Sequence, residues 1–190
     1  MNPAPEEVLA VTRAWVDRAV IGLNLCPFAK AVQARNQIRY VVSEVTSAEA
    51  LLLELREEMQ RLNAADPAEI DTTLLIHPEV LNDFLEYNEF LGAADGLLVE
   101  LELDGVLQVA SFHPQFQFAG TRAEDVTNAT NRSPYPTLHL LREDSVDRAV
   151  AAFPLAEVIY EKNIRTLQAL GADGVATLQA QCRADAAAAK

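Results

Sequence analysis

Short runs of apolar and β-branched residues alternate along this chain with longer segments whose apolar residues recur at helical spacing. The clearest strand-like runs cover residues 38–45, 72–76 and 137–141. Runs of four to eight such residues suit strands, whereas apolar positions three and four apart predict helices with one buried face. Because the two patterns alternate, we expect an α+β (mixed α/β) fold, with a mixed sheet flanked by helices.

Asp104-Gly105 gives the strongest local turn signal, since it separates the apolar residues 97–103 from 106–112. A type I′ turn needs positive φ at both central positions, and Asp-Gly between two strand-like runs meets that need. The sequence therefore predicts an antiparallel β-hairpin here, which brings the expected sheet to about five strands.

Helices are predicted between these strands and after the last of them. Thr46-Ser47-Ala48-Glu49 matches a capping box, in which a hydroxyl and a carboxylate satisfy backbone N–H groups at a helix start. Gly171 is expected to end a helix that Pro154 begins. We expect one globular domain over residues 1–171, followed by an Ala-rich helix and tail over 172–190. The predicted helices cover residues 6–22, 27–35, a segment after the capping box, 79–91, 144–152, 154–170 and 173–184.

Charge and composition exclude several classes of protein. The chain has 15 basic and 28 acidic residues, a net charge of −13, and its basic residues are scattered. Nucleic-acid binders gather Lys and Arg on one face, so we expect no nucleic-acid partner. No apolar run approaches the roughly 20 residues of a membrane span, and the acidic N-terminus does not resemble a secretory signal. We therefore expect a cytoplasmic protein with no membrane partner; its oligomeric state stays open.

Cys26 is the first residue considered for chemistry. If it caps a helix that starts at Pro27, the helix N-terminus and nearby Lys30 would favour a thiolate, as a nucleophile needs. The alternative is that Cys26 is a small buried hydrophobe beside Leu25 and Phe28. The second cysteine lies in a polar, Ala-rich segment and predicts no disulfide or zinc site.

The three histidines follow or lie within predicted strands. His77 and His113 each precede a proline at a strand end, whereas His139 alternates with leucines and is expected to be a hydrogen-bonded structural residue. A Cys/His metal site is a further alternative. The predicted hairpin argues against it, because it would put His77 and His113 at opposite edges of the sheet. No common phosphate-loop, serine-hydrolase or zinc-protease motif is present, and no cofactor is identified.

Residues 113–136 show no sustained periodicity, and loops beyond about 12–15 residues are uncommon in compact domains unless they are functional or disordered. Aromatic walls with a few fixed polar groups are typical of binding sites. The alternative is that Asn, Ser and Pro make turns while the aromatics anchor the loop to the core. The candidate ligand-binding residues in this loop are Phe116, Asn131, Arg132, Ser133 and Tyr135.

Three stretches, at residues 22–29 (GLNLCPFA), 111–120 (SFHPQFQFAG) and 131–143 (NRSPYPTLHLLRE), resemble a bacterial family known as domain of unknown function 1415. The resemblance covers residues 15–171. It implies a single-domain bacterial protein, and it implies no activity and no catalytic residue.

The residues themselves thus carry the functional hypothesis, and whether the chain is an enzyme stays open. We expect a small-molecule site for an anionic or planar ligand, formed by the Cys26 turn and the 113–136 loop, with Arg132 holding the negative group. If the protein is an enzyme, Cys26 is the expected nucleophile and His113 its base. The alternatives are a non-catalytic binding or interaction module and a Cys/His metal protein.

Overall fold

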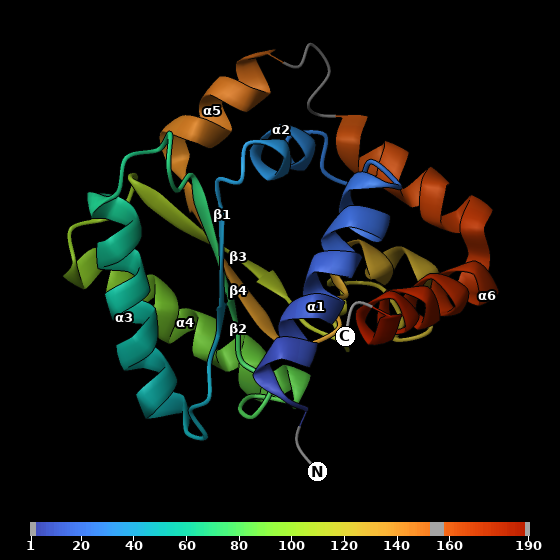
Figure 1. The fold of residues 1–190 in the computed structure, drawn as a ribbon, viewed down its shortest axis with the longest axis horizontal. Coiled ribbons are helices and arrows are strands. Elements are labelled where there is room, and N and C mark those ends of the chain that lie inside the picture. The colour runs from blue at the N-terminus through green and yellow to red at the C-terminus, as the bar shows by residue number, and fades with distance from the viewer. Residues whose placement is uncertain (1–2, 153–157, 189–190) are drawn as a thin grey trace.

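The computed structural model describes residues 3–152 and 158–188, and the helices pack on both faces of one sheet (Figure 1). This confirms the mixed α+β class. In chain order the elements are α1 (Pro5–Trp15), the π-helix η1 (Val16–Ile21), α2 (Ala29–Ala34), β1 (Ile38–Val42), α3 (Ala48–Ala64), β2 (Thr72–Ile76), α4 (Phe84–Glu100), β3 (Leu107–Phe112), the 3₁₀ helix η2 (Val126–Asn131), β4 (Thr137–Arg142), α5 (Glu143–Ala152) and α6 (Ile159–Ala188).

The sheet has four strands in the order β1-β2-β4-β3, where about five were expected. β1 and β2 are parallel, and β4 runs antiparallel to both β2 and β3. Because β4 lies between β2 and β3, those two strands point the same way and end at the same edge of the sheet.

The expected hairpin at Asp104-Gly105 is wrong, because residues 97–100 belong to α4. Tyr87, Phe90, Ala94 and Leu97 are buried at intervals of three and four residues, so the apolar run continues a helical stripe. A short apolar run does not distinguish a buried strand from a buried helix end. Gly105 does adopt positive φ, at 76°, but β3 then pairs with β4.

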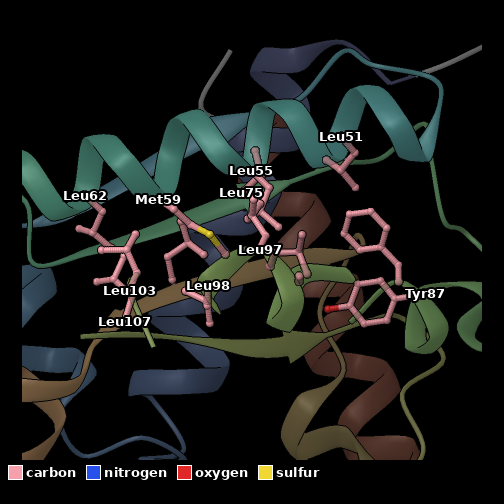
Figure 2. Close-up of a cluster of buried hydrophobic side chains, with 14 of the residues drawn as sticks. Leu51, Leu55, Met59, Leu62, Leu75, Tyr87, Leu97, Leu98, Leu103 and Leu107 are labelled. Carbon is pink, nitrogen blue, oxygen red and sulfur yellow. The ribbon is translucent and has the colours of Figure 1, made fainter. Parts of the chain in front are cut away.

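One face of the sheet is covered by α3 and α4, which build the larger core with it. Leu51, Leu55 and Met59 of α3 are fully buried there, and Figure 2 shows them directed at leucines of α4 and the sheet. Ser47, rather than Thr46, caps α3, since its hydroxyl accepts a hydrogen bond from the Ala50 N–H at 3.2 Å.

The opposite face of the sheet is covered by α1 and η1, with α6 packed behind α1 (Figure 1). Trp15 meets the ring of Phe112 edge-on, with centroids 5.5 Å apart, and both lie in a smaller core with Leu74. α1 and η1 leave part of this sheet face uncovered, and α2 and α5 lie at one end of it (Figure 1). No helix in the described ranges is long and apolar enough to cross a membrane.

Two glycines set the ends of helical segments. η1 ends at Gly22, where a Cβ atom would lie 2.2 Å from the Arg18 carbonyl oxygen, so only glycine fits. Gly171 has φ 68° and ψ 173° and interrupts α6, which confirms the predicted break. The expected start of that helix at Pro154 lies outside the described residues.

Candidate functional site

The open part of the sheet face forms the floor of a cleft of about 840 Å³. Its floor comes from alternate residues of all four strands, the ones that point away from α3 and α4. Ligand pockets commonly have volumes of about 300–1,000 Å³ and mostly apolar linings with a few polar groups. The lining includes Ile38, Thr72, Leu74, Gln108, Ala110, Phe112, His139 and Leu141 on the floor, and Trp15, Val16, Val20, Cys26, Phe28, Val32, Arg35, Val146 and Arg148 on the walls.

His139 lies at the centre of this floor, because β4 is an inner strand and His139 pairs with Leu74 on one side and Ala110 on the other. Its Nε2 lies 2.7 Å from the hydroxyl oxygen of Thr72. That hydroxyl has one proton, and it donates it to the Leu140 carbonyl. The hydroxyl must therefore accept from His139, which assigns the proton of the imidazole to Nε2.

The other nitrogen of His139, Nδ1, is consequently a hydrogen-bond acceptor. It has no hydrogen-bond partner among the described residues, and His139 is half-buried on the lining of the cleft. Burial lowers the pKa of His139 to about 4, so the imidazole is neutral at pH 7. The floor of the cleft thus presents one uncharged acceptor that a ligand can reach.

The two ends of the cleft differ in chemistry. Phe112 pairs with Thr137, which lies two residues before His139 on β4, and its ring contacts both His139 and Trp15. This end is therefore aromatic. The end beyond Leu141 is bounded by α2 and α5, and it carries the arginines of the cleft.

Cys26 also lines this cleft and is half-buried. It does not cap a helix: α2 begins at Ala29, and its N-cap is Phe28, without a side-chain cap. The expected N-cap is wrong because the chain forms a turn after η1, in which the Leu25 N–H donates to the Val20 carbonyl at 2.9 Å.

His113 lies on the other face of the sheet, fully buried against Tyr87 and Phe84 of α4. Both of its ring nitrogens are occupied: Nδ1 accepts from the Gln115 N–H at 3.0 Å, and Nε2 donates to the Leu81 carbonyl at 3.2 Å. The structure therefore does not bring His113 together with Cys26 as a base.

His77 and His113 lie at the same edge of the sheet, so the expectation that they lie at opposite edges is wrong. Both rings pack on Tyr87, because β2 and β3 end at the same edge. His77 Nδ1 donates to the Val80 carbonyl at 3.0 Å, while Nε2 is buried and has no hydrogen-bond partner in the part of the chain that the structure describes. Burial lowers the pKa of His77 to about 4.

Within the described ranges, no three His, Cys, Asp or Glu residues are grouped so as to hold a metal ion.

The polar residues of the 113–136 loop use their side chains to hold the loop itself. Arg132 donates to the carbonyls of Phe116 at 3.1 Å and Ala123 at 2.6 Å, and burial lowers the pKa of its guanidinium. The Asn131 amide donates to the Ser111 carbonyl at 3.0 Å, and the Ser133 hydroxyl donates to the Tyr135 carbonyl at 2.6 Å.

The aromatic residues of this loop attach it to the helices. Phe116 packs edge-on against Phe84 of α4, with centroids 5.3 Å apart. Tyr135 is half-buried, and burial raises its pKa. The loop and the Cys26 turn do meet, where Leu25 and Arg132 line the same cavity, but its volume of about 110 Å³ is small for a ligand.

Sequence reasoning missed the cleft, although one signal for it was present. Thr72, Gln108 and His139 are polar residues that lie on the cleft face of strands whose other residues are mostly apolar. A sheet buried on both faces reads as near-continuous apolar runs, whereas polar residues at alternate positions indicate a face that is partly open.

Comparisons with known proteins place the chain in a family by sequence. No curated protein and no solved structure matches it. The sequence model of one family matches residues 7–177, which include most of α1 through α5 and the first part of α6. The chain therefore belongs to the family described as protein of unknown function DUF1415.

Proposed function

We propose that this protein binds a small molecule in the cleft on the open sheet face, through a flat or apolar body and a hydrogen-bond donor that reaches His139. The observation that carries the proposal is the Nδ1 acceptor of a neutral histidine on the floor of an apolar cleft of about 840 Å³. An apolar ligand body gains by leaving water, and an O–H or N–H on it satisfies the acceptor.

Binding is favoured over acid–base catalysis by the chemistry of the same histidine. A general base works best when its pKa lies near the operating pH, and burial lowers the pKa of His139 to about 4. The proposed nucleophile and base, Cys26 and His113, are held apart, because His113 packs under α4 with both nitrogens engaged. The loop arginine expected to hold an anion, Arg132, instead donates to backbone carbonyls.

Isothermal titration calorimetry with 2-naphthol, a flat molecule with one O–H donor, tests the proposal. Ala110 lines the floor beside His139, so Ala110→Phe fills the cleft and should abolish binding. Ala93→Phe is the matched control, since Ala93 is exposed on α4, which covers the other face of the sheet. Absence of binding to the wild type, or equal binding by the Ala110→Phe variant, would refute the proposal.

A further inference from the structure

We infer that the ligand of this cleft carries a carboxylate, bound at the end of the cleft where Arg35 and Arg148 lie. This inference rests on the proposed function and names the class of ligand: a flat or apolar acid with a separate hydrogen-bond donor. Both arginines line the cleft, Arg35 directly after α2 and Arg148 on α5.

The sheet register puts the two arginines at the same end. Ile38 at the start of β1 pairs with Thr72 at the start of β2, and Thr72 pairs with Leu141 near the end of β4. Arg35 lies three residues before Ile38, and α5 begins directly after β4. Figure 1 accordingly shows α2 and α5 at the same end of the sheet, at the top of the view.

The charges at this end favour an anion. Among the described residues of the lining, the charged ones are Arg35, Arg148 and Asp71. Asp71 accepts a hydrogen bond from the Ser145 hydroxyl at 2.6 Å, and Arg148 donates to the same hydroxyl at 2.9 Å. Arg35 makes no ion pair or side-chain hydrogen bond with any described residue.

These arginines are therefore a local surplus of positive charge on a chain of net charge −13, and the donors of Arg35 and the remaining donors of Arg148 are available to a ligand. The planar guanidinium matches a carboxylate with two parallel hydrogen bonds, and it also packs well beside aromatic rings. An apolar cleft that ends in such groups suits an amphipathic acid.

Strand geometry gives the spacing that such a ligand needs. Leu141 lies two residues beyond His139 on the same face of β4, which is about 7 Å at 3.3 Å per residue. The arginine end begins there, so we expect the donor and the carboxylate of the ligand to be separated by at least about 7 Å. A naphthalene ring substituted at opposite ends has about this length, which makes 6-hydroxy-2-naphthoate a suitable probe.

Calorimetric titration with 2-naphthol and 6-hydroxy-2-naphthoate tests the inference, because the two probes differ only in the carboxylate. We expect the carboxylate to tighten binding to the wild type about tenfold, as a charge-assisted contact does. The double variant Arg35→Gln/Arg148→Gln should lose this gain and bind 2-naphthol as the wild type does. Arg165→Gln, an exposed change on α6 outside the cleft, is the matched control and should keep the gain.

The outcomes separate this inference from the proposed function. If the wild type binds 2-naphthol and the carboxylate adds nothing, or if the double variant keeps the gain, the arginine end does not bind carboxylates and only the proposed function survives. If neither probe binds the wild type, both are overturned.

Discussion

Replacement of Arg132 by alanine should destabilise the protein. The sequence alone suggests an anion-binding arginine whose loss abolishes binding and leaves the stability almost unchanged. In the structure the guanidinium instead joins two distant parts of the 113–136 loop, because it donates to the carbonyls of Phe116 and Ala123. Its removal leaves both acceptors without this partner.

The expected loss follows from these two contacts. Hydrogen bonds from a charged donor contribute about 1.5–3 kcal/mol each. Arg132 is half-buried, so the lower value applies, and the two bonds together give about 3 kcal/mol. For a chain of this size, 1 kcal/mol corresponds to about 2–4 °C in Tm, so the Tm of the Arg132→Ala variant should fall by about 6–12 °C.

Urea denaturation of Arg132→Ala, Arg132→Lys and Arg122→Ala measures this loss. A lysine ammonium lacks the fork that reaches both carbonyls, so Arg132→Lys should recover about half of the stability. Arg122 is an exposed arginine of the same loop whose side chain has no hydrogen bond or ion pair with the described residues, so its loss should cost less than about 0.5 kcal/mol. If Arg132→Ala and Arg122→Ala are equally stable, Arg132 does not hold the loop.

Three further predictions concern the cleft and the helices. Because the pKa of folded His139 is about 4, the unfolded chain binds more protons than the folded chain between pH 4 and 6.5. The free energy of unfolding should therefore rise with pH in this window, by up to about 1.4 kcal/mol per pH unit from this histidine, and denaturation of His139→Gln should show a correspondingly shallower profile. Saturating 2-naphthol should slow alkylation of Cys26, measured by mass spectrometry, but not that of buried Cys182. If Cys26 is alkylated at the same rate with and without 2-naphthol, the bound ligand does not cover Cys26. Gly22→Ala should lower the free energy of unfolding by about 1–3 kcal/mol, because the new Cβ clashes with the backbone. Gly96→Ala, in open space on α4, should raise it by up to about 1 kcal/mol. Equal shifts of Tm in the two variants would contradict this prediction.

The sequence predicts those parts of the fold where one local pattern is unambiguous. Residues 72–76 form a strand as expected, and Gly171 interrupts a helix, because only a residue free to adopt positive φ fits there. Residues 97–100 were misassigned because a leucine run with a following Asp-Gly satisfies the hairpin pattern locally. The helix forms because Leu97 packs in the core with the leucines of α3. A local sequence pattern cannot show this long-range contact.

The candidate site was less predictable, since it depends on which strands are neighbours. Insertion of β4 between β2 and β3 brings His139 to the centre of the sheet and brings His113 to the same edge as His77. The sequence shows Arg132 as a charged residue in a long loop, which is compatible with a ligand contact or with a structural contact. In the structure its partners are backbone carbonyls. The cleft itself results from how much of the sheet α1 and η1 leave uncovered.

The most direct test compares the binding of 2-naphthol with that of 2-methoxynaphthalene, which lacks the donor. Glutamine can put an amide N–H near the position of Nε2 and so keep the bond to Thr72, but it has no acceptor at the position of Nδ1. If His139 accepts the ligand's hydrogen bond, the wild type should prefer 2-naphthol by about 5–10-fold, and His139→Gln should show no preference. Equal binding of both compounds by the wild type, or a preference that persists in the His139→Gln variant, would contradict a ligand site at His139.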